Sequence, residues 1–260
     1  MRRIAFVTLT LGLTLRPGAL GAQGGFHWSG RLAPGKRLEI QGVNGDIRAS
    51  AAAGDEVEVS ARKHAPRGDT AAVEIQVVPF EDGVAICAVY PTPVRAAEPN
   101  SCTPGRRHSN TENNDVVVDF TVRIPAGVTL SAATVNGLVD AEGVDGSVHA
   151  RTVNGGIQIA TARYADATTV NGSITAALGR GDWSDALAFR TVNGSIALTL
   201  PATLSTDVRT ETVNGDITSA FPLLVSGHIG PRRVRGTIGT GGRALDVRTV
   251  NGGITLNKGP

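Results

Sequence analysis

Hydrophobic and polar residues alternate with a period of two along most of the chain, which is typical of half-buried β-strands. Val57 and Val59 alternate with acidic and polar neighbours, and residues 116–124 form the longest run of this kind. Two further runs, residues 73–77 and 84–89, flank a turn that contains Pro and Gly, and they predict a β-hairpin. The pattern therefore predicts an all-β protein.

From residue 129 onward, one phrase interrupts the alternation at intervals: Thr-Val-Asn-Gly-x-Ile/Val. Full copies begin at Thr134, Thr152, Thr169, Thr191, Thr212 and Thr249. An early copy at residues 42–47 lacks the Thr, and a worn copy at residues 234–238 has Arg235 in place of Asn. A phrase that recurs roughly every 20 residues is typical of a repeat architecture, in which each unit buries its apolar face by stacking on the next.

The Asn-Gly pair shifts the phase of the alternation, as between Leu130 and Val139 around Val135. We expect Gly, and Asn beside it, to adopt the positive φ of such a corner. Two architectures fit: a meander of hairpins, or a β-solenoid whose corners stack about 4.8 Å apart. The recurrence of Thr and Val beside the Asn-Gly pair favours the solenoid. A half-step copy at residues 144–148 suggests coils with two short faces.

The repeated Asn residues are predicted to form a structural turn ladder, with their amides hydrogen-bonded along the stack. They are Asn44, Asn136, Asn154, Asn171, Asn193, Asn214 and Asn251. The alternative is a row of ligands for sugar or calcium. Calcium-binding repeats need an Asp at a fixed place, and only Asp46 and Asp216 follow an Asn-Gly pair here. The row therefore predicts no metal site.

Residues 1–22 are predicted to be a cleaved signal peptide. Arg2 and Arg3 precede a largely apolar run at residues 4–15, and small residues at 19–22 offer a cleavage site. The run is shorter than the roughly 20 residues that span a bilayer. No later segment is long and apolar enough either. We therefore expect a secreted, periplasmic or cell-surface protein without a transmembrane span after signal cleavage.

The mature chain is expected to have two parts. Residues 23–128 form a β-rich region with the first repeat coil and a polar loop at residues 92–115, and residues 129–260 form the β-solenoid repeats. The whole chain has 25 Lys+Arg against 23 Asp+Glu, and the signal peptide carries three of the basic residues and no acid. The mature chain then has 25 − 3 = 22 against 23, a net charge of −1. Nucleic-acid binding loses its compositional support.

Two cysteines, Cys87 and Cys102, are the only ones in the chain. In an exported protein such a pair predicts one disulfide. It would close a loop of about 15 residues, contribute roughly 3 kcal/mol to stability, and tie the polar loop to the strand that contains Cys87.

Catalytic chemistry has little support in the sequence. The candidate acids are Asp140, Glu142, Asp145, Asp166 and Glu211, which occupy different slots of the repeat. A glycosidase needs two carboxyl groups about 5–10 Å apart. No Gly-x-Ser-x-Gly elbow is present, and the histidines are scattered. We therefore predict no catalytic residue, no metal ligand and no cofactor, and hence no enzyme.

The Thr-Val-Asn-Gly phrases, together with the strand at residues 116–124 and its Pro-Ala-Gly ending, resemble the bacterial DUF4097 family. The resemblance covers residues 37–257 approximately. It implies an exported, right-handed β-solenoid of single-stranded β-helix type. Members of this family are named adhesins on the strength of their architecture, and the resemblance brings no catalytic residues. The cysteine pair and the long polar loop depart from the family pattern.

A surface for binding is predicted from charge and aromatic residues. Arg151, Arg190 and Arg248 stand two positions before the repeat Val on the presumed outer face, and Trp183 lies in a turn. The arginines could dock an acidic polysaccharide or a lipid head group, and the Trp could stack on a sugar. The alternatives are a solvated face and a Trp that caps a coil. We predict a cell-envelope binding module for glycan or surface protein. The alternatives are a self-assembling envelope scaffold and a polysaccharide-active enzyme.

Overall fold

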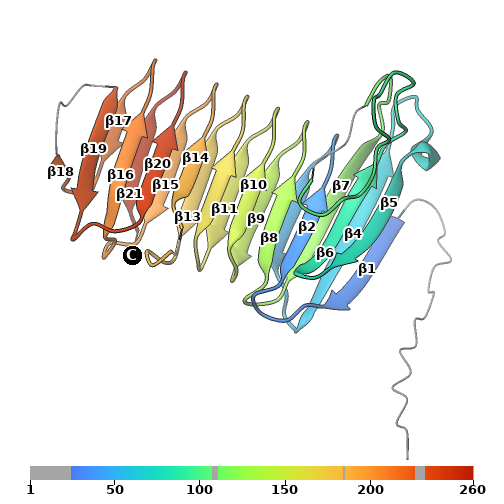
Figure 1. Ribbon diagram of the computed structural model, residues 1–260, viewed down its shortest axis with the longest axis horizontal. Coiled ribbons are helices and arrows are strands. Elements are labelled where there is room, and N and C mark those ends of the chain that lie inside the picture. Colours follow the sequence, from blue (N-terminus) through green and yellow to red (C-terminus); the bar gives the residue numbers. More distant parts are fainter. Residues whose placement is uncertain (1–24, 107–110, 184, 226–231, 260) are drawn as a thin grey trace, which may run out of the picture.

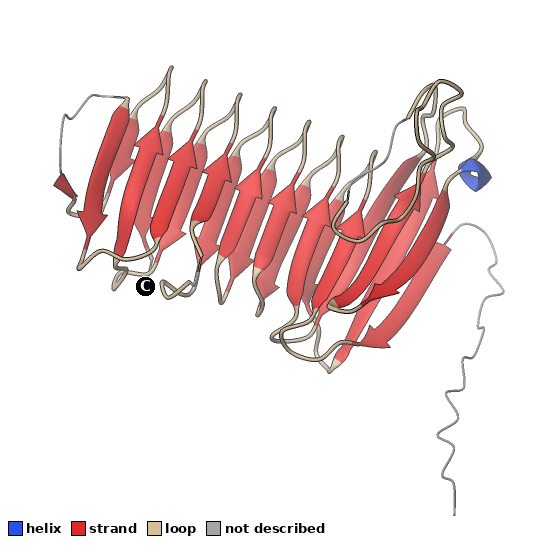
Figure 2. Cartoon of the chain, viewed as in Figure 1, coloured by secondary structure: helices blue, strands red, loops and turns tan. Residues whose placement is uncertain are grey.

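The computed structural model describes residues 25–106, 111–183, 185–225 and 232–259 (Figure 1). The described part consists of β-strands and their connections, with one short 3-10 helix, η1 (Thr70–Ala72) (Figure 2). The expectation of an all-β fold is confirmed. The predicted signal peptide lies outside the described residues.

The strands form two long sheets, which we call sheet A and sheet B. In spatial order sheet A contains β1 (Gly25–Arg31), β4 (Glu56–His64), β7 (Val117–Ile124), β3 (Ile47–Ala51), β9 (Val139–Val144), β11 (Ile157–Thr161), β13 (Ile174–Leu178), β15 (Ile196–Leu200), β21 (Ile254–Lys258) and β17 (Ile217–Ser219). Sheet B contains β18 (Leu224–Val225), β19 (Arg233–Ile238), β16 (Thr206–Glu211), β20 (Ala244–Arg248), β14 (Leu187–Arg190), β12 (Ala165–Thr168), β10 (Val148–Arg151), β8 (Thr129–Ala133), β2 (Arg37–Gln41), β6 (Gly83–Val89) and β5 (Glu74–Phe80).

In the repeat region, each coil contributes one strand to each sheet. β10 pairs in parallel with β8 and β12, and β11 pairs in parallel with β9 and β13. A meander of hairpins would give antiparallel neighbours, so this arrangement excludes it for the repeats. The fold is β-solenoid-like, with two short strands per coil. The hairpin predicted near residues 73–89 is present as the antiparallel pair β5 and β6.

The core lies between the two sheets and follows the alternation of the sequence. Inward positions hold aliphatic residues such as Leu130, Ile157 and Ile174, all fully buried, while their neighbours along each strand face solvent. Burying a side chain of this size contributes about 1.5–3 kcal/mol. The stacking of coils is therefore the main source of stability in the repeats.

The order of coils in the stack differs from their order in the chain. The last coil, β20–β21, lies between β14–β15 and β16–β17. At the other end, β6 and β7 lie outside β2 and β3, although they follow them in sequence. The repeated Asn residues obey the same spatial order, because Asn251 bridges Asn193 and Asn214.

The corner glycines are required by space as well as by backbone conformation. A Cβ on Gly194 would lie 2.1 Å from the carbonyl oxygen of Gly172 in the neighbouring coil, and a Cβ on Gly137 would lie 1.9 Å from that of Gly45. The expectation of positive φ at the Asn residues is wrong. Among the described non-glycine residues only Asn113 has positive φ, at 53°. Asn therefore occupies the corner for its side chain, not for its backbone.

Candidate binding surface

The Thr of the repeated phrase bonds its coil to the preceding coil in the stack. The buried Thr hydroxyl donates to a glycine carbonyl, as Thr191 does to Gly172 at 2.8 Å. Equivalent bonds join Thr134 to Gly45, Thr152 to Gly137, Thr169 to Gly155, Thr249 to Gly194 and Thr212 to Gly252. The Thr thus satisfies a carbonyl that the corner leaves without a strand partner.

The Asn side chains form a continuous amide ladder. Their order in the stack is Asn44, Asn136, Asn154, Asn171, Asn193, Asn251 and Asn214, and from the second onward each Nδ2 donates to the Oδ1 of the preceding Asn at 2.7–2.8 Å. At the first end, the ladder meets Tyr90, whose hydroxyl donates to Val116 O at 2.9 Å and accepts from the Asn44 backbone N–H at 3.3 Å. Burial raises the pKa of Tyr90 to about 12.

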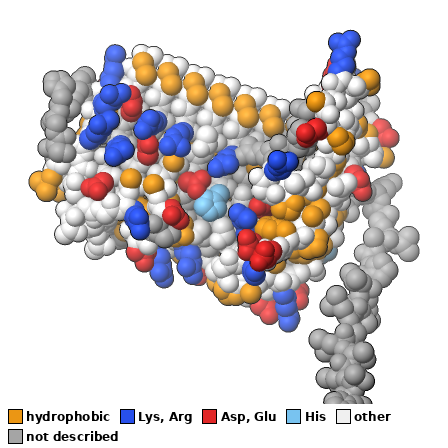
Figure 3. Space-filling model, viewed as in Figure 1, with side chains coloured by type: hydrophobic (Ala, Val, Ile, Leu, Met, Phe, Trp, Pro, Cys, Tyr) orange, Lys and Arg blue, Asp and Glu red, His pale blue; other side chains and the backbone are white. Residues whose placement is uncertain are grey.

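Beside the ladder runs a row of valines from the same phrase. Val170, Val192, Val250 and Val213 are between 37 and 48% exposed. A line of hydrophobic side chains runs along one long border of the molecule (Figure 3). This narrow row follows the C-terminal ends of the sheet B strands.

The outer face of sheet B contains a hollow of about 260 Å³. Its floor is β8, where the outward residues Ser131 and Ala133 are small. One wall is made by side chains of β2 and by Gly105, and the opposite wall by His149 and Arg151 of β10. The hollow exists because a strand with small outward residues lies between two strands that carry long ones.

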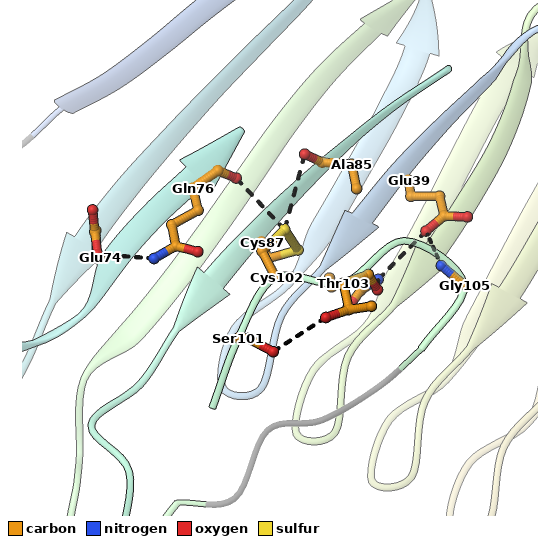
Figure 4. The surroundings of a disulfide bond; sticks show 10 residues. Glu39, Glu74, Gln76, Ala85, Cys87, Ser101, Cys102, Thr103 and Gly105 are labelled. Carbon is orange, nitrogen blue, oxygen red and sulfur yellow. Dashed lines mark hydrogen bonds between the residues drawn. A yellow bond between two sulfur atoms is a disulfide. The ribbon is translucent and has the colours of Figure 1, made fainter. Parts of the chain in front are cut away.

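The wall at β2 is built by the polar loop after β6. A disulfide joins Cys87 of β6 to Cys102, which confirms the predicted pair (Figure 4). Both sulfurs lie in a small second core on the outer face, with Ala85 and neighbouring apolar residues of β5 and β6. Further along the loop, Thr103 O accepts from Gln41 Nε2 at 3.3 Å. The loop is thereby fixed across β2.

Glu39 attaches this loop to the sheet. Its side chain is nearly buried, accepts from the backbone N–H of Gly105 at 2.9 Å, and lies 3.2 Å from Arg37 Nε. The Arg37 guanidinium in turn lies 5.4 Å from the centre of the Phe80 ring. A buried carboxylate needs such partners, so Glu39 serves the structure of the wall.

Three residue types of a nucleophilic triad lie in one row on the outer face of sheet B, and two of them, Ser131 and His149, line the hollow. Ser131, His149 and Asp166 are register partners on β8, β10 and β12, and His149 Nδ1 bonds Asp166 Oδ2. A triad also requires a hydrogen bond between nucleophile and base. Among the contacts described in the structure, none joins Ser131 to His149. The row therefore consists of a hydrogen-bonded His–Asp pair with a serine beside it, without the Ser–His bond of a triad. Within the described residues, no group of three or more His, Cys, Asp or Glu could hold a metal ion.

The three predicted arginines all lie on the outer face of sheet B, but they differ in their partners. Arg190 and Arg248 are register partners that share Asp246, at 3.4 Å and 2.6 Å. Hydrogen bonding to Asp246 raises the pKa of Arg248 further. Arg151 borders the hollow and has no acidic partner among the described residues. In the predicted row, Asp246 therefore partly neutralises the charges of Arg190 and Arg248, whereas the charge of Arg151 at the hollow is not paired with an acid in the described part of the chain.

Two further arginines belong to this face, and the sequence analysis missed them. Arg209 of β16 and Arg235 of β19 are register partners in an antiparallel pair. Neither forms an ion pair within the described part of the chain, although Asp246 of β20 is in register with Arg209, whereas their neighbour Arg233 pairs with Glu211. Like charges placed directly opposite one another destabilise a sheet. Their meeting depends on the antiparallel return of β19, which the worn phrase at Arg235 does not reveal.

The interpretation of Trp183 as a sugar-stacking residue is wrong. The side chain is 4% exposed and packs in the main core. Its ring faces cannot reach a ligand, which leaves the alternative of a Trp that closes the core beside a long turn.

The model of one protein family matches residues 35–257, which include every strand except β1 and the last residue of β21, and the whole face described above. The chain belongs to the DUF4097 family, described as Toastrack. This agrees with the resemblance seen in the repeated phrase. No curated protein matches this DUF4097 chain.

Solved structures similar to this DUF4097 protein include one named a "putative cell adhesion protein" from Clostridium sporogenes ATCC 15579. It is 10% identical, with a TM-score of 0.49, and the match covers 90% of this chain and 100% of that chain. Another, named a "putative adhesin" from Bacteroides fragilis NCTC 9343, is 11% identical with a TM-score of 0.25, and the match covers 91% and 98%. In the described part of the DUF4097 chain, no helix has the length and hydrophobicity needed to cross a bilayer.

Proposed function

We propose that the protein is an exported, non-enzymatic binding module of adhesin type, which attaches to an acidic polysaccharide of a cell envelope through the outer face of sheet B. The coils are proposed to wind in the right-handed sense that parallel connections almost always take. Export is supported by the disulfide, because such bonds persist in oxidising compartments.

The pair Arg209 and Arg235 is the observation that carries the proposal. The two arginines are register partners on adjacent strands, and the acid beside them, Asp246 of β20, is already bonded to Arg190 and Arg248. A bound anion would offset the remaining repulsion between like charges. Arginine suits this role because its planar fork binds carboxylate and sulfate groups with two hydrogen bonds. Arg248 lies on the neighbouring strand, in register with Glu211.

The form of the face favours an extended polymer over a small molecule or a membrane. Strands follow one another about 4.8 Å apart, so outward side chains form rows along the long axis of the molecule. Arg151 beside the hollow and the Arg209–Arg235 pair are separated by several strands of one continuous sheet. A chain of charged sugars could bind both along such a face.

Co-sedimentation of the protein with polygalacturonate, beside neutral dextran, tests the proposal. We expect saturable binding to polygalacturonate alone, weakened by salt because exposed charges are screened. The double variant Arg209→Gln/Arg235→Gln should lower the affinity about tenfold or more. Arg62→Gln/Arg123→Gln is the matched control, since it removes two arginines from the outer face of sheet A.

Each other outcome points away from the proposal. Equal loss in both double variants would indicate attraction by net charge without a site on sheet B. Equal binding to dextran would exclude recognition of acidic groups, and binding to anionic vesicles in preference to polygalacturonate would indicate a lipid ligand. Pelleting without any polymer would instead support the self-assembling scaffold.

A further inference from the structure

We infer that Asn214 is a site of spontaneous modification, at which the folded protein converts asparagine to aspartate and isoaspartate, while the other six Asn-Gly pairs are protected by the stack. Asn-Gly is the dipeptide in which this reaction is easiest, because glycine has no side chain to hinder the attacking nitrogen. The chain contains seven such pairs, one at each ladder residue.

The reaction uses only the chain and water. The backbone nitrogen of the following glycine loses its proton to hydroxide and attacks Cγ of the Asn side chain. A bond forms between that nitrogen and Cγ, Nδ2 takes a proton from water and so restores the hydroxide, and the Cγ–Nδ2 bond breaks as Nδ2 leaves as ammonia. Water then opens the five-membered imide at either carbonyl, giving Asp or isoaspartate. One water is consumed and one ammonia released.

Six of the seven glycine nitrogens are held by the next coil. Their N–H groups donate to the backbone carbonyl of the following Asn in the stack at 2.8–3.0 Å: Gly45 to Asn136, Gly137 to Asn154, Gly155 to Asn171, Gly172 to Asn193, Gly194 to Asn251 and Gly252 to Asn214. The proton that must leave is therefore bonded. The nitrogen also faces a carbonyl oxygen, not its own side chain.

The same six Asn side chains are held in the ladder. The Oδ1 of each accepts from the Nδ2 of the next Asn at 2.7–2.8 Å. Attack on Cγ requires the side chain to rotate, which would break this bond. An inner pair can therefore react only when the neighbouring coil opens, and opening of a packed coil is rare.

Asn214 lies at the end of the stack and lacks both restraints. Among the described residues, nothing accepts from the Gly215 N–H and nothing donates to Asn214 Oδ1. Its Nδ2 still donates to Asn251 at 2.8 Å. The end of the stack is not the end of the chain, because β20–β21 is inserted before β16–β17. Sequence order alone would place Asn251 in the unprotected position.

Peptide mapping after incubation of the folded protein at mildly alkaline pH tests the inference. Tryptic cleavage separates residues 210–232 from residues 249–258, so Asn214 and Asn251 are measured independently. We expect residue 214 to deamidate about tenfold faster or more, since two hydrogen bonds of ordinary strength protect residue 251. In urea, both should react at similar rates. Equal rates in the folded protein, or a faster rate at Asn251, would overturn the inference.

Two variants give a second readout by isoelectric focusing of aged protein. Asn214→Ser removes the reactive amide at an exposed end of the ladder, so the acidic species that accumulates with time should disappear. Asn251→Ser should leave that species in place. An unchanged acidic species in Asn214→Ser would show that the modification lies elsewhere.

Discussion

At the scale of single residues, the Thr-Val-Asn-Gly phrase divides three separate tasks among neighbours. The Thr hydroxyl donates a hydrogen bond to a glycine carbonyl of the adjacent coil, as Thr191 does to Gly172. The Asn amide joins its coil to the next, and the Gly permits the two backbones to approach. Because each task is met against the equivalent residues of the adjacent coil, the phrase must recur as a whole.

The steric task can be tested at Gly194. Its φ lies outside the left-handed region, so an added Cβ acts through space alone, and that Cβ would lie 2.1 Å from the Gly172 carbonyl oxygen. A backbone oxygen cannot move aside as a flexible side chain can. We expect Gly194→Ala to lower the free energy of unfolding by about 3 kcal/mol or more, measured by urea denaturation.

Gly54→Ala is the control for this prediction. Gly54 also lacks positive φ, and an added Cβ would have nothing within 4 Å. The change should be neutral or stabilise by up to about 1 kcal/mol. A similar loss in both variants would mean that glycine acts through backbone freedom and not through close approach.

The hydroxyl of Tyr90 makes stability depend on alkaline pH. Burial raises its pKa from 10.0 to about 12. Between these values the unfolded chain loses the proton while the folded chain keeps it, so the unfolded state binds fewer protons and stability falls as pH rises. Below about pH 10 this contribution is complete, and it is lost by about pH 12.

Tyr90→Phe should remove that pH dependence and lower stability at neutral pH. The neutral-pH loss is expected at about 1 kcal/mol, because Val116 O loses the shorter of its two hydrogen bonds and the Asn44 backbone N–H loses its acceptor. Urea midpoints measured from about pH 7 to pH 12 test both parts. A variant with the same slope as the parent between pH 10 and 12 would show that another group is responsible.

At the scale of elements, antiparallel strands close most ends of the parallel stack. β5 covers β6 at one end of sheet B, and β19 covers β16 at the other. β4 and β1 continue sheet A beyond β7 in the same way. β17 is the exception: it ends sheet A with three residues and no partner beyond it among the described strands. Short edge strands limit unwanted pairing between molecules.

The disulfide stabilises the element that forms one wall of the hollow. Cys87 and Cys102 are 15 residues apart, which corresponds to about 3 kcal/mol by chain entropy. In Cys87→Ala/Cys102→Ala we expect the loop to leave β2 and the Gly105 amide to lose protection in hydrogen exchange. Amides of β11 and β13 serve as the internal control, and they should be unchanged. Retained protection at Gly105 would show that Glu39 alone holds the loop.

The sequence predicted where the strands and corners lie, but it did not predict which side chains from distant segments meet. Alternation located the strands and the repeated phrase located the corners, because both depend on residues close in sequence. The disulfide could be predicted because the chain has a single pair of cysteines. The meeting of Arg209 with Arg235 required the antiparallel return of β19. The burial of Trp183 required the fold of a long turn. Neither is encoded in a local pattern.

At the scale of the whole molecule, the order of the stack is the feature that local patterns could not predict. Every coil presents nearly the same phrase to its neighbours, so β14–β15 could accept either β16–β17 or β20–β21. The structure places β20–β21 there, and the antiparallel strand β19 occupies the far edge of β16. A strand capped in this way has only its other edge left for a parallel neighbour, which β20 supplies.

Hydrogen exchange should reveal this order directly. β21 ends close to the C-terminus of the chain, yet it pairs with β15 on one side and β17 on the other. We expect the amides of β21 to exchange as slowly as those of β15, and the amides of β17 to exchange about tenfold faster or more, because the ends of a stack fray first.

Deletion of residues 204–240 removes the segment from β16 to β19 and leaves six residues, 201–203 and 241–243, to link β15 to β20. In that variant β21 becomes the edge, so those of its amides that faced β17 should become fast while β15 stays slow. Fast exchange of β21 in the intact protein, with slow exchange of β17, would mean that the coils stack in the order of the chain.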